Sequence, residues 1–209
     1  MHCLKQQAPK QAPSSVLRAA LLAFVTLSFV GCAQLDTPSP ELDGTAKAEQ
    51  VRAQETAAFE RAVLLHREGD FSGASDGYKE LLVRFPKNTA ARINLAQIEI
   101  QNNKPEQAKA LVDDALSLEP NNVQALTLAG VIAREQGEFE SAEEYYRKAL
   151  SVNPNYIPAL KNLGILLDLY RGRLDEALVF YEQAQALAAE PDPKLKDWIF
   201  DIKRRIGGS

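Results

Sequence analysis

The chain has 209 residues, of which 45% are hydrophobic and 25% are charged, and its formal net charge is −4. This is an ordinary soluble composition with enough apolar material for one domain. Residues 1–31 hold three of the 24 basic residues and no acidic residue, so the rest of the chain has 21 basic against 28 acidic residues, a net charge of −7. That balance argues against nucleic-acid binding, because neutralising phosphates needs clustered Lys and Arg.

Residues 1–31 have the pattern of an export signal. A polar segment that carries Lys5, Lys10 and Arg18 leads into an apolar run of 12 residues, 19–30, which ends at Gly31. Twelve helical residues span about 18 Å at ~1.5 Å each, well short of a ~30 Å hydrocarbon core. A basic region, a short apolar region and a small residue at the cleavage point are typical of a secretory signal peptide.

The sequence FVGC, residues 29–32, resembles the lipobox of bacterial lipoproteins. In that family the cysteine becomes the first mature residue and receives a diacylglyceryl group, so the resemblance implies lipidation of Cys32. The family usually has leucine where this chain has Phe29, and an ordinary signal peptide or an uncleaved anchor stays open. Ala33 stands where lipoproteins of the inner membrane often carry Asp. The resemblance therefore implies the periplasmic face of the outer membrane, with a soluble periplasmic protein as the alternative.

The two cysteines agree with this interpretation. Cys3 lies inside the predicted signal, so the mature chain keeps Cys32 alone and forms no disulfide and no cysteine-based metal or redox site. Residues 32–44 are rich in Pro, Ser, Asp and Gly, which predicts a flexible tether. A helix is expected from Thr45, with Thr45 or Asp43 as its cap.

Beyond the tether the sequence repeats itself every 34 residues. The recurring positions are three alanines, three terminal prolines and a larger residue four places after each alanine: Ala74, Ala108, Ala142; Pro86, Pro120, Pro154; Tyr78, Val112, Tyr146. A fixed period of this length indicates stacked units, none of which buries its own hydrophobic face alone. The period and these positions resemble the tetratricopeptide repeat, a helix–turn–helix unit of about 34 residues.

The resemblance implies an all-α, right-handed superhelical solenoid over residues 45–192, with four units at about 55–88, 89–122, 123–156 and 157–191. The fourth unit carries one extra residue in its turn, within 169–173. Gly130 and Ala96 are expected where the two helices of a unit press closest. Residues 193–209 form a capping helix and tail, whose apolar face of Trp198, Ile199 and Ile202 covers the last unit.

No catalytic constellation is visible in the mature chain. His66 is its one histidine, and the acidic pairs Asp113-Asp114 and Glu143-Glu144 are expected on solvated helix faces. No glycine-rich phosphate loop, zinc-ligand spacing or nucleophile elbow occurs. We therefore expect no enzyme activity, cofactor, metal or small-molecule substrate.

The resemblance implies a concave groove, lined by the first helices of the units, that receives a protein or peptide. Laying the family's inward positions onto this chain gives thirteen groove residues: Phe59, Val63, His66, Ile93, Asn94, Gln97, Thr127, Val131, Arg134, Lys161, Asn162, Ile165 and Asp168. Asn94 and Asn162 stand where the family often holds a ligand backbone. The basic residues of the subgroup that captures C-terminal carboxylates are missing apart from Lys161. The alternative is that the apolar members pack between units.

The expected function is therefore a lipid-anchored scaffold for a complex of the cell envelope. Lipoproteins of this build resemble assembly factors of pili and secretion machinery. The segments NLGILLDLYRGRLDEAL (162–178) and DWIFDIKRR (197–205) resemble more closely the repeat proteins that accompany ExbB/ExbD/TonB-type transport systems. A periplasmic adaptor that regulates cell-wall enzymes is the alternative.

Overall fold

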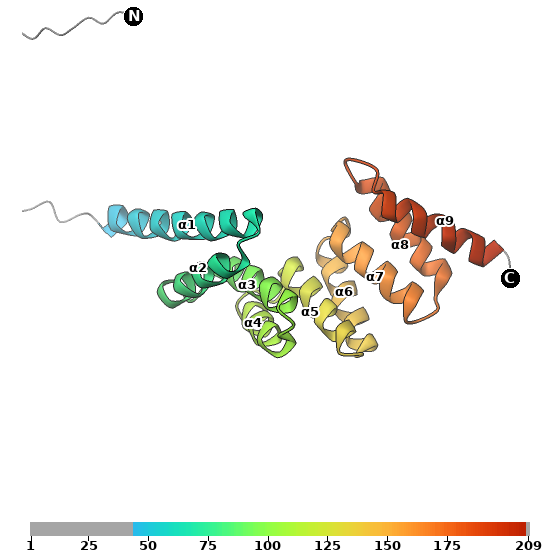
Figure 1. Ribbon diagram of the computed structural model, residues 1–209, viewed down its shortest axis with the longest axis horizontal. Helices are drawn as coiled ribbons and strands as arrows, with labels where there is room; N and C mark the ends of the chain where they lie inside the picture. The colour runs from blue at the N-terminus through green and yellow to red at the C-terminus, as the bar shows by residue number, and fades with distance from the viewer. Residues whose placement is uncertain (1–43, 208–209) are drawn as a thin grey trace, which may run out of the picture. The chain divides into compact units, whose positions relative to one another are not determined.

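The repeat appears in the structure as a series of paired helices (Figure 1). The computed structural model describes residues 44–207, and within them the chain forms nine α-helices and no strand. Their bounds are α1 Gly44–Glu68, α2 Phe71–Arg84, α3 Thr89–Gln101, α4 Pro105–Leu118, α5 Val123–Glu135, α6 Phe139–Val152, α7 Ile157–Leu169, α8 Leu174–Leu187 and α9 Pro193–Gly207. The predicted signal peptide, Cys32 and most of the predicted tether lie outside the described residues.

The helices pack in the order that stacked units require. The first helix of each unit packs on its second helix, the second helix packs on the first helix of the next unit, and α9 packs on α8. The first helices α3, α5 and α7 also touch one another in sequence. This arrangement confirms the all-α repeat solenoid.

Each turn inside a unit contains one residue with positive φ, the region that favours glycine and tolerates asparagine. These residues are Gly69 at +84°, Asn103 at +57°, Gly137 at +81° and Gly172 at +65°. The first three are spaced by 34 and the last by 35. The turn before α8 spans four residues, 170–173, against three before α4 and α6, so the predicted extra residue is present.

The connections between successive units also recur with the 34-residue period. The second helices α2, α4 and α6 stop two residues before the predicted prolines. Asn88 and Asn122 then cap the next first helices: Asn88 Oδ1 accepts from the Ala91 amide at 2.7 Å, and Asn122 Oδ1 accepts from the Ala125 amide at 3.1 Å. Tyr156 takes this place before α7, with no side-chain cap.

Small residues let the two helices of a unit approach closely, as the sequence predicts. A Cβ added at Gly130 would lie 2.4 Å from Cε1 of Tyr146, and one added at Gly164 would lie 2.5 Å from Cε1 of Tyr181. In the second unit the equivalent positions hold Ala96 and Val112, which share a core cluster. Alanine is larger than glycine and valine is smaller than tyrosine, so the two differences offset each other. Tyr146 and Tyr181 are fully buried.

The last helix covers the last unit, as expected. Leu195 and Ile202 of α9 are buried, and Trp198 lies 5.4 Å from Tyr181 between ring centroids. Ile199 packs, partly buried, against the same core. Leu195 was not among the predicted contacts, although it continues the same face one turn earlier. Within residues 44–207, no helix combines the length and the apolar character that a membrane crossing requires.

Candidate partner-binding groove

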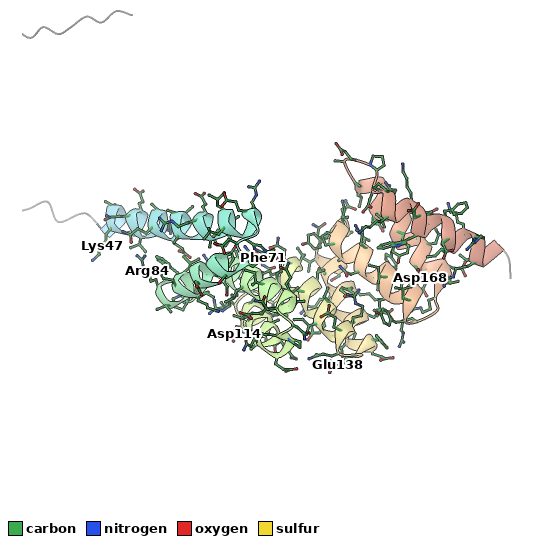
Figure 2. The ribbon with its side chains drawn as sticks, viewed as in Figure 1. Lys47, Phe71, Arg84, Asp114, Glu138 and Asp168 are labelled. Atoms are coloured by element: carbon green, nitrogen blue, oxygen red, sulfur yellow. The ribbon has the colours of Figure 1, made fainter. Side chains whose placement is uncertain are left out.

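The thirteen predicted groove residues all lie on the first helices α1, α3, α5 and α7, but their side chains are not equally accessible. Ile93 is 1% exposed and belongs to the core. Thr127 is buried, and its hydroxyl donates to the carbonyl of Val123 in its own helix at 2.7 Å. Asp168, labelled in Figure 2, is also buried. These three side chains contribute to packing in the structure.

The segment around α9 binds two of the four predicted groove residues of the fourth unit, Lys161 and Asp168. Lys161 Nζ donates to Asp192 Oδ2 at 2.7 Å, just before α9, and Arg205 Nη1 donates to Asp168 Oδ1 at 2.7 Å, near the end of α9. The ammonium of Lys161, with further hydrogen bonds from the start of α9, holds the pKa of Asp192 below its ordinary value of 3.8. The cap is thus tied to α7 near both of its ends.

Aromatic residues gather in the first unit. The rings of Phe59 and Tyr78 lie 6.0 Å apart, and the His66 ring meets Phe71 edge-on at 5.5 Å. Burial raises the pKa of the Tyr78 hydroxyl above its ordinary value of 10.0, and the opposing hydrogen bond from Asn94 Nδ2 to Tyr78 Oη measures 3.1 Å. Val63 packs, partly buried, on the same cluster.

The two predicted asparagines make different contacts. Asn94 reaches Tyr78 in the preceding unit, whereas Asn162 Nδ2 donates to the carbonyl of Pro158 in its own helix at 2.8 Å. Tyr146, the counterpart of Tyr78 for Asn162, is left with a buried hydroxyl that has no hydrogen bond within the described residues. Both amides keep their carbonyl oxygens without a hydrogen bond in the same part of the chain.

Among the thirteen predicted groove residues, only Gln97 has an exposed side chain, and the others that are not buried are half-buried. Gln97 is exposed and Arg134 half-buried, and neither makes a hydrogen bond or ion pair within residues 44–207. Val131 and Ile165 are half-buried against the core. Between α3 and α7 the first helices therefore present amide, guanidinium and apolar groups side by side.

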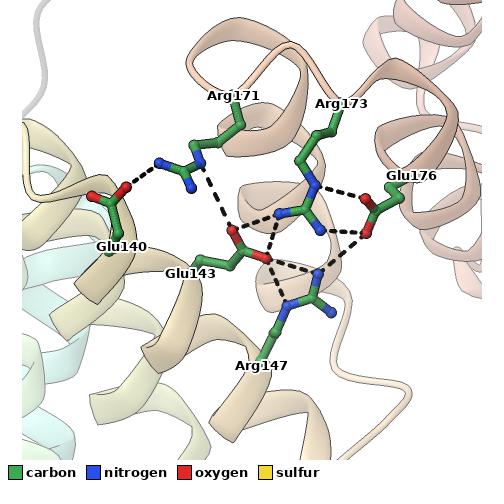
Figure 3. Close-up of polar contacts among 6 residues, drawn as sticks. All are labelled: Glu140, Glu143, Arg147, Arg171, Arg173 and Glu176. Carbon is green, nitrogen blue, oxygen red and sulfur yellow. Dashed lines mark hydrogen bonds and ion pairs between the residues drawn. The ribbon is translucent and has the colours of Figure 1, made fainter.

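A charged cluster that was not predicted from the sequence lies between α6 and the turn before α8 (Figure 3). Glu143 was expected on a solvated face, but its side chain is only 14% exposed. Arg147 Nε donates to its Oε1 at 2.8 Å, and Arg173 Nη1 donates to both carboxylate oxygens at 2.8 and 2.9 Å. The expectation fails because Arg147 of the same helix and Arg173 from the turn before α8 both bind and cover this carboxylate.

Two further glutamates complete this cluster. Glu176 accepts from Arg173 at 2.6 Å, and Arg171 pairs with Glu140 (Figure 3). Burial raises the pKa of Glu143, but the hydrogen bonds from Arg147 and Arg173 outweigh it, so the pKa lies below its ordinary value. Three arginines and three glutamates balance in charge. Among the described residues, no group of three or more His, Cys, Asp or Glu is arranged to hold a metal ion.

Comparisons with known proteins agree with this architecture. Residues 65–131 and 123–190 each match a protein-family model described as a tetratricopeptide repeat. The uncharacterized protein y4yS of Sinorhizobium fredii is 30% identical over 139 residues, which cover 65% of this chain and 76% of that protein. Cellulose synthase operon protein C of Pseudomonas fluorescens is 30% identical over 96 residues, 46% of this chain but only 8% of that protein.

Solved structures share the fold at lower identity. PilF of Pseudomonas aeruginosa has a TM-score of 0.68 at 19% identity, with 76% of this chain and 72% of that chain covered. A thermophilic tetratricopeptide repeat protein of Thermus thermophilus has a TM-score of 0.63 at 20% identity, with 73% and 83% covered. The MamA protein has a TM-score of 0.57 at 22% identity, with 73% and 82% covered.

Proposed function

This chain belongs to the tetratricopeptide repeat family, and from that membership we propose that it is a non-enzymatic scaffold that holds a segment of a partner protein along its first helices. Domains of this family bind protein partners in general, and the family match over residues 65–190 is the observation that carries the proposal. Stacked repeats suit this role because successive units extend one surface.

The chemistry of the row between α3 and α7 favours a segment with free backbone groups. The carbonyl oxygen of Asn94 and the whole amide of Gln97 are available to a partner's backbone, while Val131 and Ile165 offer apolar contact beside them. Arg134 adds one cation. An extended segment or an amphipathic helix fits such a mixture of groups.

The proposed location is the periplasmic face of the outer membrane, with the lipid at Cys32 as the anchor. The support is the signal-like pattern of residues 1–31 and the cysteine that follows it. Two or more acyl chains hold a protein stably at a membrane. The proposed partners are components of an ExbB/ExbD/TonB-type or pilus machine, on the sequence resemblance alone. A periplasmic adaptor of cell-wall enzymes is the second candidate.

A crosslinking and pull-down experiment from membranes tests the anchor and the partner together. The full-length tagged protein is compared with Cys32→Ser. Under the proposal the unmodified protein fractionates with the outer membrane and captures a defined envelope complex, and the variant is released from the membrane. Finding both forms in the cytoplasm would overturn the location, and capture of a cell-wall hydrolase alone would favour the second candidate.

The groove is tested with two exposed glutamines. Gln97→Lys places a charge on α3, in the proposed groove, and Gln107→Lys places the same charge on α4, outside it. We expect the first change to reduce partner capture about ten-fold, the effect of roughly 1.4 kcal/mol, and the second to leave it unchanged. Equal capture by the two variants would remove the groove from the proposal.

A further inference from the structure

A polar cleft of about 260 Å³ opens between α2 and the turn that joins α3 to α4. Its lining includes Ser75, Asp76, Lys79, Glu99, Asn102 and Lys104, and Phe71, labelled in Figure 2, also lines it. We refer to it as the first cleft, because it lies at the boundary between the first and second units. None of the thirteen groove residues lines it.

Glu99 in the first cleft is unusual for its position. The residues 34 places before and after it, and 34 places further, are Leu65, Ala133 and Leu167, so the other units have an apolar side chain there. Glu99 is 3% exposed, and its Oε2 has no hydrogen bond within the described residues. Burying a carboxylate costs stability unless it is paired and hydrogen-bonded. An apolar residue would therefore serve packing better.

The two lysines of the first cleft hold Glu99 loosely. Lys79 Nζ is 3.8 Å from Oε1, and Lys104 Nζ is 3.6 Å from Oε2. Both distances exceed the length of a charge-assisted hydrogen bond, about 2.7–2.9 Å. Each ammonium therefore keeps its donors for another group, and each side chain is about half exposed, at 55% and 50%.

The boundary between the third and fourth units, called the last boundary below, has residues equivalent to those of the first cleft, and there two cations bind a carboxylate. Arg147 stands 68 residues, two periods, after Lys79, and Arg173 takes the place of Lys104 directly before the second helix. Both arginines bind the carboxylate of Glu143, at 2.8 Å (Figure 3). Glu143 in turn stands two periods after Ser75. In the first cleft, therefore, a small hydroxyl replaces the carboxylate that two cations bind at the last boundary.

The middle boundary, between the second and third units, satisfies its own charges. Lys109 stands at the position of Ser75 and Asp113 at the position of Lys79, and Lys109 Nζ donates to Asp113 Oδ2 at 2.8 Å. The space there is about 80 Å³. The first cleft combines a larger space with two cations that donate no hydrogen bond within residues 44–207.

We propose that the first cleft binds a carboxylate side chain of an acidic segment in a partner protein, between the ammonium groups of Lys79 and Lys104. Both ammonium groups lie beyond hydrogen-bond length from Glu99, so each keeps donors for an incoming carboxylate, which would be bound as Arg147 and Arg173 bind Glu143. Asp76 on the rim is exposed and opposes the ligand, so it limits the affinity. This site is additional to the proposed groove and stands whether or not the groove binds a partner.

A binding titration tests the proposal directly. The probe is fluorescein-labelled triglutamate, with triglutamine as its neutral twin, added to the full-length protein and followed by fluorescence anisotropy at low salt. We expect Lys79→Gln and Lys104→Gln each to weaken triglutamate binding about ten-fold, the value of one charge-assisted hydrogen bond. Lys148→Gln removes an exposed charge from α6 and should have no effect, and Asp76→Asn should tighten binding.

Three results would overturn the proposal. Equal weakening by Lys79→Gln and Lys148→Gln would show diffuse attraction to the surface. Weaker binding in Asp76→Asn would show that the cleft attracts cations. Inorganic phosphate that displaces triglutamate at far lower concentration than acetate would assign the cleft to phosphoryl groups. Lys79→Arg keeps the charge and should retain binding, which separates loss of the site from loss of the fold.

A second test places the missing carboxylate in the chain itself. Ser75→Glu copies the residue that fills the last boundary, Glu143, and Ser75→Gln has nearly the same size without the charge. Under the proposal, Ser75→Glu has a higher melting temperature than Ser75→Gln and no longer binds triglutamate. A lower melting temperature for Ser75→Glu, with binding retained, would contradict a carboxylate site.

Discussion

The N-terminal and C-terminal halves of the repeat array are built differently from the same unit. In the C-terminal half the third unit, the fourth unit and α9 share one core cluster, closed by fully buried tyrosines, and their boundary carries a charge cluster in which every Glu143 oxygen is hydrogen-bonded. In the N-terminal half the first unit shares a core cluster with α3 of the second unit, and the boundary between these units holds the buried carboxylate of Glu99 with one unsatisfied oxygen. The two boundaries therefore differ in whether the buried carboxylate between the units is fully hydrogen-bonded within the chain.

The largest effect is expected where the C-terminal half packs most closely. Gly130→Ala places a methyl group 2.4 Å from the ring of Tyr146, which is fully buried. We expect a loss of about 3 kcal/mol in the free energy of unfolding, measured with urea, because overpacking forces the helices apart. In the N-terminal half, Gly77→Ala meets only the Ala62 methyl at 3.1 Å and gains helix propensity, so it should change stability by less than about 1 kcal/mol. Equal losses would contradict the comparison.

A smaller loss is expected from the charge cluster. Glu143→Gln should lower the free energy of unfolding by about 2 kcal/mol, since it removes hydrogen bonds from two arginines, whereas Glu144→Gln on the exposed face should not. The folded pKa of Glu143 lies below its ordinary value of 4.5. Its contribution is therefore complete above pH 4.5 and is lost as the pH falls through the folded pKa. Below pH 4.5 the free energy of unfolding of Glu143→Gln should therefore fall less with decreasing pH than that of the unmodified protein.

Replacing the buried carboxylate of the N-terminal half, Glu99, should raise the stability of the protein, not lower it. Glu99→Leu copies Leu65 and Leu167 and leaves behind two lysines that are about half exposed. We expect stability to rise by about 1 kcal/mol, because an apolar residue avoids the desolvation of a buried charge. A rise in the urea midpoint at unchanged slope is the measurement. A marked loss of stability would show that Glu99 is needed for the fold.

The smallest effect belongs to the middle boundary. The pair between Lys109 and Asp113 is exposed and four residues apart on one helix. Lys109→Ala should cost only about 0.4 kcal/mol, and less at high salt. Thermal melts at low and high ionic strength are the measurement. A loss of stability that shrinks at high salt comes from the exposed ion pair, whereas a loss independent of salt comes from packing.

Much of the fold was predictable because it rests on local rules that recur at a fixed spacing. Prolines end helices, glycine or asparagine supplies positive φ in a turn, and small residues mark a close crossing, so the helix pairs, the extra residue before α8 and the role of Gly130 could all be inferred. The groove positions follow from the same spacing, and their use by a partner stays a prediction. Their accessibility could not be inferred, because Ile93 faces the core and Asp168 is bound by Arg205 of α9, 37 residues away.

The sequence by itself determined the repeat, its length, its turns and the family to which the chain belongs, since each depends on residues within one period. Only the tertiary structure decided which charges are satisfied. Glu143 and Glu99 are both glutamates within helices. Glu143 is hydrogen-bonded by Arg147 of its own helix and by Arg173 of the turn before α8, whereas Glu99 faces two lysines beyond hydrogen-bonding distance. The physical reason is that an ion pair depends on the distance and burial of groups from different units, and these are set only when the units stack.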